Sequence, residues 1–111
     1  MNWITLSDLS QLDEIIETST KKPVLIFKHS TRCSVSRMAL KNFENEYSIS
    51  DNEASAYFLD LLNYRDISNE IASRFEVQHQ SPQLILIKNG KASYSATHSD
   101  IDATELKENF N

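Results

Sequence analysis

The sequence of 111 residues is poor in four residue types: it has one Cys, one Gly, one Trp and two Pro. The single Cys excludes an internal disulfide and any metal site built from several cysteines. The single Gly excludes phosphate-binding glycine loops, because each of them needs several glycines at fixed spacing. The longest strongly apolar runs, Val24–Phe27 and Leu84–Ile87, are far too short to cross a membrane.

The overall composition is typical of one globular domain, which we expect to span residues 1–111. Hydrophobic residues make up 40% of the chain and charged residues 24%, which argues against disorder. The net charge of −5 argues against nucleic-acid binding, which uses a basic surface. No disulfide framework or signal-peptide pattern is present. We therefore expect a cytoplasmic monomer that binds neither nucleic acid nor membrane.

Charge is unevenly distributed around the only cysteine, Cys33. The segment from Lys21 to Lys41 contains six basic residues and no Asp or Glu, whereas all sixteen acidic residues lie elsewhere. Chance or a solvated surface would explain such a segment as well. The coincidence with Cys33 nevertheless favours a basic environment for its sulfur. The six residues are Lys21, Lys22, Lys28, Arg32, Arg37 and Lys41.

Four helices are predicted from apolar residues at helical spacing and from the capping residues that precede them. The first helix carries Leu9, Leu12, Ile15 and Ile16 and ends near Thr18–Lys22, before Pro23. The second helix is expected over Cys33–Glu46, with an apolar stripe of Val35, Met38, Ala39, Phe43 and Tyr47. The third carries Ile67, Ile71 and Phe75. The expected N-cap is Ser7 or Asp8 for the first helix, Asp66 for the third, and Ser99 or Asp100 for a fourth helix near the end of the chain.

Strands alternate with these helices. Buried strands are predicted over Val24–Lys28, Ala54–Leu62 and Leu84–Lys88, and Asn89-Gly90 predicts a tight hairpin into Lys91–His98. Trp3–Leu6 would add a fifth strand. Alternation implies parallel pairs with right-handed crossovers, closed by an antiparallel hairpin. The sequence thus predicts an α/β fold of three layers, α/β/α, with a central mixed sheet of four or five strands.

The predicted position of Cys33 favours a reactive thiol. A thiolate is stabilised by a helix N-terminus and by nearby cations, and Cys33 is expected to begin a helix. Arg32 precedes it, and Arg37 follows one turn later on the same face. Ser36 would offer its hydroxyl or its backbone N–H to the thiolate. The alternative is that Cys33 is a small buried hydrophobe, which its polar neighbours argue against.

A single thiol without a second Cys cannot complete an internal disulfide cycle. In Cys33-Ser34-Val35-Ser36 a serine stands where a Cys-x-x-Cys pair has its second cysteine. The natural cycle for one thiol therefore borrows a small thiol, which releases the first one from Cys33.

The order of elements, with Cys33 at a helix start and Ser81-Pro82 before a hairpin, resembles the thioredoxin-like fold. The segment from His29 to Ser36, His-Ser-Thr-Arg-Cys-Ser-Val-Ser, resembles the monothiol bacilliredoxin family. This resemblance implies removal of bacillithiol from protein mixed disulfides, with Cys33 as nucleophile and bacillithiol as co-substrate. The partners would be S-bacillithiolated proteins, and no permanently bound cofactor is expected.

The same resemblance implies that Pro82 is a cis-proline facing the cysteine and that it leaves the backbone of Ser81 free for a substrate chain. Thr31 and Ser34 would also contact the substrate, and Arg32, Ser36 and Arg37 would stabilise the thiolate. Bacillithiol carries carboxylates, which suit the basic segment.

Two other functions stay open at this point. A monothiol glutaredoxin would use glutathione or hold an iron–sulfur cluster between two chains, although such proteins usually have Gly-Phe after the cysteine, where Ser34-Val35 stands here. A non-catalytic thioredoxin-like binding module would have a cysteine of ordinary reactivity.

The remaining polar candidates have weaker signals. His29 would tune the thiol or end a strand, and His79 would border the substrate groove. His98 is expected at the surface. Asp60 would be a proton-transfer group or an ordinary hydrogen-bonded carboxylate, and Trp3 a packing residue. The three His and one Cys have no metal-binding spacing, so no metal is expected.

Overall fold

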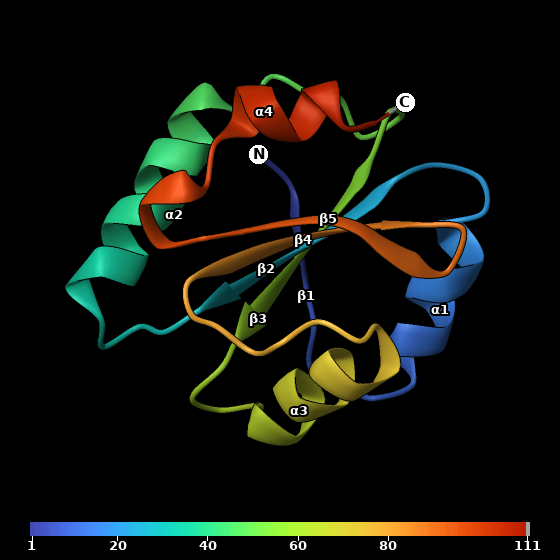
Figure 1. Ribbon diagram of the computed structural model, residues 1–111, viewed down its shortest axis with the longest axis horizontal. Helices are drawn as coiled ribbons and strands as arrows, with labels where there is room; N and C mark the ends of the chain where they lie inside the picture. Colours follow the sequence, from blue (N-terminus) through green and yellow to red (C-terminus); the bar gives the residue numbers. More distant parts are fainter. Residues whose placement is uncertain (111) are drawn as a thin grey trace.

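A computed structural model describes residues 1–110, and its centre is a five-stranded mixed sheet in the order β1-β3-β2-β4-β5 (Figure 1). Strand β3 runs parallel to both of its neighbours, and β4 runs antiparallel to β2 and β5. The fifth strand expected near the N-terminus is therefore present, at one edge. The strands are β1 (Trp3–Thr5), β2 (Val24–His29), β3 (Ser55–Asp60), β4 (Gln83–Lys88) and β5 (Lys91–Thr97).

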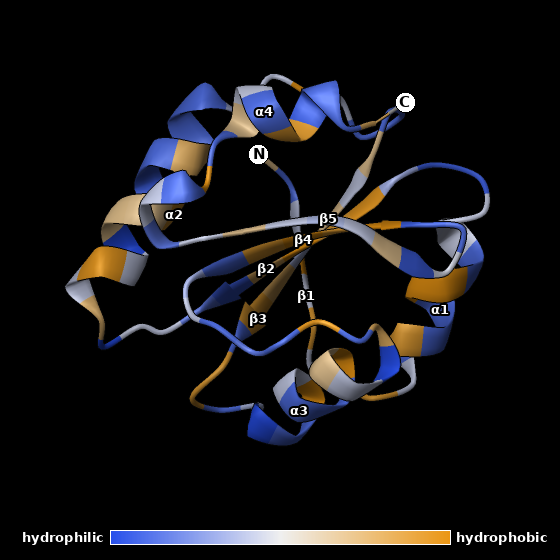
Figure 2. Ribbon diagram, in the orientation of Figure 1, coloured by the Kyte–Doolittle hydropathy of each residue, from blue (hydrophilic) through white to orange (hydrophobic). Residues whose placement is uncertain are grey.

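Helices cover both faces of this sheet (Figure 1). Helices α1 (Gln11–Thr18) and α3 (Arg65–Arg74) lie on one face, and α2 (Ser34–Glu46) and α4 (Ala103–Glu108) lie on the other. Much of the ribbon of the central strands is hydrophobic (Figure 2), and every residue of β2 is buried. The predicted three-layer α/β/α fold is confirmed. None of the helices within residues 1–110 is long and apolar enough to span a membrane.

The hairpin between β4 and β5 has the geometry that the sequence predicts. Asn89 and Gly90 both have positive φ, at 52° and 76°, which a type I′ turn requires. The Gly90 N–H donates to Ser19 Oγ at 2.8 Å, and a Cβ at Gly90 would lie 3.4 Å from the Ile16 side chain. The only glycine in the chain therefore serves a turn that also packs against the C-terminal end of α1.

The predicted N-caps of three helices were wrong by two or more residues. Helix α1 begins at Gln11, because the Asp8 carboxylate accepts from Ser10 within a turn before the helix. Leu9 precedes the helix and is 45% exposed. Tyr64 is the N-cap of α3, and Asp66 lies in its first turn. In α4 the cap is Asp102, whose carboxylate accepts the N–H groups of Thr104 and Glu105.

The predicted apolar stripe of α2 is only partly a core face. Phe43 is buried against the sheet and Ala39 packs on the same cluster, together with Trp3, whose ring contacts Phe27, Phe43 and Phe58. The first turns behave differently, since Val35 is 52% exposed and Met38 67% exposed. These two side chains face a groove beside the cysteine instead of the sheet.

Candidate active site

Cys33 occupies the N-cap of α2, one short turn beyond the end of β2. Its backbone is extended, with φ −100° and ψ 122°, and the side chain is half-buried. The Cys33 N–H donates to Ser30 O at 3.2 Å, and Cys33 O accepts the first helical bond from the Arg37 N–H at 3.0 Å. The strand, the turn and the helix thus hold the cysteine at a defined place on the surface.

The electrostatic environment of this position favours an anion. The first amides of a helix have no helical acceptor and carry its positive end. The first turn of α2 contains no acidic residue. Arg32 is exposed beside the cysteine, and the Arg37 guanidinium donates to Thr31 O at 3.0 Å. Arg37 therefore braces the cysteine loop, and the contribution of both arginines to thiolate stability stays a prediction.

Ser36 anchors the cysteine loop from below. It is fully buried, its Oγ accepts the Ser30 N–H at 3.0 Å, and it lies 2.8 Å from His29 Nδ1. Burial lowers the pKa of His29, so a neutral ring whose Nδ1 accepts the Ser36 hydroxyl proton fits this contact. The hydroxyl expected to face the thiolate is thus engaged with His29 and Ser30, which leaves the backbone N–H of Ser36 as its route to the sulfur.

The loop before β4 contains the second predicted part of the site. The Ser81–Pro82 peptide bond is cis, as expected. Within residues 1–110 the buried Ser81 Oγ has no hydrogen-bond partner. Gln83, itself buried, holds the loop by donating from Nε2 to Gln78 O at 3.0 Å. The Pro82 carbonyl accepts the His98 N–H at 3.1 Å, which ties this loop to the end of β5.

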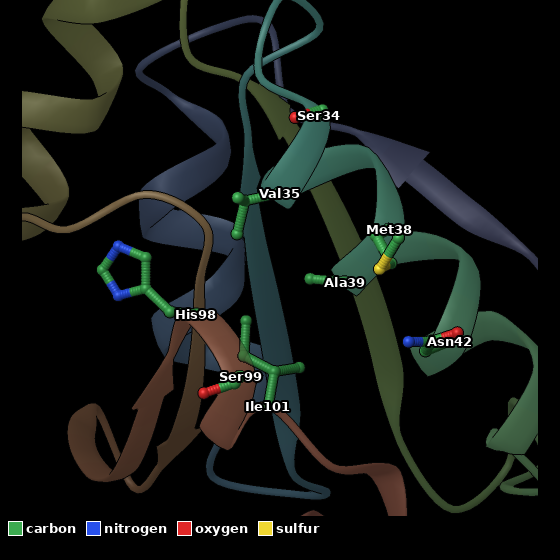
Figure 3. A pocket seen from close by; sticks show the side chains of 8 residues that line it. All are labelled: Ser34, Val35, Met38, Ala39, Asn42, His98, Ser99 and Ile101. Atoms are coloured by element: carbon green, nitrogen blue, oxygen red, sulfur yellow. The ribbon is translucent and has the colours of Figure 1, made fainter.

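A groove of about 290 Å³ is lined by Ser34, the residue after Cys33, and by the residues that Figure 3 labels. One side belongs to α2 and the other to the segment that follows β5, where the short 3₁₀ turn η1 spans His98–Asp100. No charged carboxylate, lysine or arginine lines it. The lining residues are Ser34, Val35, Met38, Ala39, Asn42, His98, Ser99 and Ile101.

His98, which was expected only at the surface, also lines the groove. It is exposed, but it has φ 53°, in the left-handed region that residues other than glycine rarely adopt. This backbone places an imidazole at the border of the groove (Figure 3). The bond from the His98 N–H to the Pro82 carbonyl keeps it beside the Pro82 loop. A polar residue directly after an edge strand gives no sequence signal for such a position.

Lys28 is the clearest departure from the expected basic surface. Its side chain is 0% exposed, and its Nζ contacts Ser68 O and His79 Nδ1, each at 3.2 Å. Burial lowers the pKa of Lys28 to about 8. The pKa of His79 is lowered by burial and then by the Lys28 charge. The apolar run around Lys28 could have suggested an inward position, since β2 is buried on both faces.

Asp60 and Trp3, two further candidates from the sequence, both hold neighbouring segments in place by hydrogen bonds. The Asp60 carboxylate accepts from the Leu62 N–H at 3.2 Å and from Asn63 Nδ2 at 2.8 Å, so it shapes the turn after β3. Trp3 packs in the aromatic cluster, as expected, and donates from Nε1 to Glu44 at 2.7 Å. Among residues 1–110 no group of His, Cys, Asp and Glu could hold a metal ion.

Solved structures with the same arrangement place the chain in a known class. One, described as having a thioredoxin fold, is 30% identical with a TM-score of 0.82, and the match covers 97% of this chain and 93% of the other. The thioredoxin of Malassezia sympodialis is 19% identical, with a TM-score of 0.73 and coverage of 96% and 86%. Fasciola hepatica thioredoxin is 18% identical, with a TM-score of 0.65 and coverage of 96% and 94%. The fold is thus that of thioredoxin, and the class of function is thiol redox chemistry.

The family model described as monothiol bacilliredoxin BrxC matches residues 4–106. The chain therefore belongs to the monothiol bacilliredoxin family. This match includes Cys33, the loop that contains Ser81 and Pro82, and the start of α4.

Proposed function

We propose that this protein is a cytoplasmic monothiol disulfide reductase that removes bacillithiol from protein mixed disulfides. The observation that carries the proposal is the only cysteine of the chain, placed at the N-cap of α2 beside Arg32, in a chain of the bacilliredoxin family. A lone, half-buried thiol in an electropositive environment is suited to begin thiol exchange and needs a second thiol to finish it.

The proposed reaction has two exchange steps. The Cys33 thiolate attacks the bacillithiol sulfur of the mixed disulfide, the sulfur–sulfur bond breaks, and the protein thiolate leaves and takes a proton from water. A second bacillithiol, as its thiolate, then attacks the bacillithiol sulfur held on Cys33. This step releases bacillithiol disulfide and regenerates the Cys33 thiolate. Overall, the protein cysteine is reduced and one free bacillithiol is oxidised, because its sulfur joins the bacillithiol released from the mixed disulfide as bacillithiol disulfide.

The site residues have separate roles in this proposal. The amides of Ser34 to Ser36 face the developing negative charge at the N-terminus of α2. Arg32, exposed next to a polar hollow formed with Thr31, Leu62 and Asn63, suits the bacillithiol carboxylates. The protein part of the substrate would lie along the backbone of Ser81 and against Pro82.

The test uses a bacillithiolated protein as substrate and mass spectrometry as readout. Wild type should release the protein thiol and accumulate bacillithiol on Cys33 when no free bacillithiol is added. Cys33→Ser should reduce release by at least about a thousandfold, because the thiol is the nucleophile. Lys107→Met, which removes an exposed lysine on α4, is the control and should retain transfer. Release by Cys33→Ser at the wild-type rate would refute the proposal, and preference for the glutathionylated substrate would favour a glutaredoxin-like function.

A further inference from the structure

A buried lysine connects the two loops of the site from the face of the sheet opposite to α2. Lys28 lies in β2, five residues before Cys33, with its Cα partnered to that of Gln83 in β4. Its side chain points to α3, where Nζ donates to Ser68 O and to His79 Nδ1, both at 3.2 Å. The hydroxyl of Ser68 also lies 3.2 Å from His79 Nδ1. Three polar groups from a strand, a helix and a loop thus meet at one point.

The loop between α3 and β4 is held to the sheet by two contacts, and the first is the contact of His79 with Lys28 of β2. The loop that follows α3 passes through His79 and reaches Ser81 and Pro82 within three residues. Gln83 provides the second, through its bond to Gln78 O. Lys28 therefore contacts the loop on the side that precedes the substrate-binding residues, while its own strand continues into the cysteine loop.

This contact has an unusual composition. Within residues 1–110 the fully buried ammonium group forms no ion pair, and its polar partners are a carbonyl and an imidazole. Burial of a cation without a carboxylate is costly. The hydrogen bonds of Nζ offset only part of this cost, so a methionine at this position would give a more stable fold. Residues that lower stability are often kept because the function needs them.

We propose that Lys28 is a positioning residue, which holds His79 and thereby aligns the Ser81–Pro82 loop with Cys33 for the protein part of the substrate. This inference rests on the proposed function. Lys28 acts through the loop and not on the sulfur, so it affects docking of a protein disulfide and leaves the intrinsic reactivity of Cys33 unchanged. Exchange with a small disulfide, which makes no use of the loop, should not depend on it.

The test compares Lys28→Met with Lys107→Met, which removes an exposed lysine on α4, on the other face of the sheet. With a bacillithiolated protein, Lys28→Met should raise KM about tenfold and change kcat by less than about twofold, since misplacement of a docking surface costs this order of magnitude. Alkylation of Cys33 by iodoacetamide and exchange with bacillithiol disulfide should stay within about twofold of wild type. Lys107→Met should match wild type in all three assays.

Substitutions at His79 test the contact itself. His79→Asn keeps an acceptor near the place of Nδ1 and should retain most of the wild-type activity on the bacillithiolated protein. His79→Leu has no acceptor there and should raise KM as much as Lys28→Met does. Amide hydrogen exchange at residues 78–81 should be faster than in wild type in Lys28→Met and in His79→Leu, but not in His79→Asn. A purely structural lysine would not separate the two His79 variants.

The outcomes separate this inference from the proposed function. Wild type without transfer from a bacillithiolated protein would overturn the proposed function, and the positioning role with it. Active wild type together with undiminished Lys28→Met activity would overturn the positioning role alone. An equal loss of protein exchange and of Cys33 alkylation would also overturn it, because Lys28 would then act on the thiol.

Discussion

Replacing Lys28 with methionine should stabilise the protein, and the size of the effect follows from its burial. The pKa of Lys28 falls from 10.5 to about 8 because the side chain is fully buried. At 1.36 kcal/mol for each pKa unit, the buried charge costs about 3 kcal/mol at pH 7. Methionine keeps the length of the side chain and removes the charge. Loss of the hydrogen bonds of Nζ offsets about 1 kcal/mol, so a net gain of about 2 kcal/mol is expected.

The stability difference between Lys28→Met and wild type should depend on pH, and the pKa of Lys28 sets the direction of this dependence. Between pH 8 and 10.5 the unfolded chain still binds the proton that folded Lys28 has released, so wild type gains stability as pH rises. Below pH 8 the lysine is charged in both states and the full cost is present. The advantage of Lys28→Met over wild type should therefore be largest at neutral pH and disappear as pH approaches 10.5. Comparison of the two proteins cancels the other groups that titrate in this range.

Urea unfolding provides the measurement, followed by circular dichroism and by fluorescence of Trp3, the only tryptophan. The free energy of unfolding comes from linear extrapolation at several pH values, and at pH 7 a gain of about 2 kcal/mol raises Tm by about 10 °C. Lys107→Met, which replaces an exposed lysine, should change the free energy of unfolding at pH 7 by less than about 0.5 kcal/mol. A Lys28→Met protein that is less stable than wild type at pH 7, or a gain that persists unchanged to pH 10.5, would refute the reasoning.

Two further substitutions test the loops of the site. His98→Gly should stabilise the fold by about 0.5–1 kcal/mol, because glycine adopts φ 53° without strain; thermal unfolding measures it, and a gain from His98→Ala as large as that from glycine would contradict the cause. Ser36→Ala should destabilise by about 1–3 kcal/mol, because the Ser30 N–H and His29 Nδ1 lose their buried partner. Ser34 is exposed, so Ser34→Ala should lower the free energy of unfolding by less than about 0.5 kcal/mol in the same assay. Equal effects of the two substitutions would argue against a stabilising role of the Ser36 hydrogen bonds.

Local patterns were sufficient for most of the fold. The short apolar run of β2, the Asn89-Gly90 turn and the helical spacing of Ile67, Ile71 and Phe75 each depend on neighbours in the sequence, and the structure confirms all three. Helix starts were less predictable. Several Ser and Asp residues near each start could cap a helix, and the choice depends on which of them is already bonded in a turn, as Asp8 is with Ser10.

The sequence by itself determined the chemistry of this protein: one thiol, at the start of a helix after a buried strand, without a second cysteine to resolve it. These properties follow from residue identity and short-range spacing. Only the tertiary structure decided the surroundings of that thiol. The positions of Lys28, His79 and His98 depend on contacts between residues that are 11 to 51 positions apart in the sequence. Val35 and Met38 show the same limit, because helical periodicity gives an apolar face but not which surface it meets.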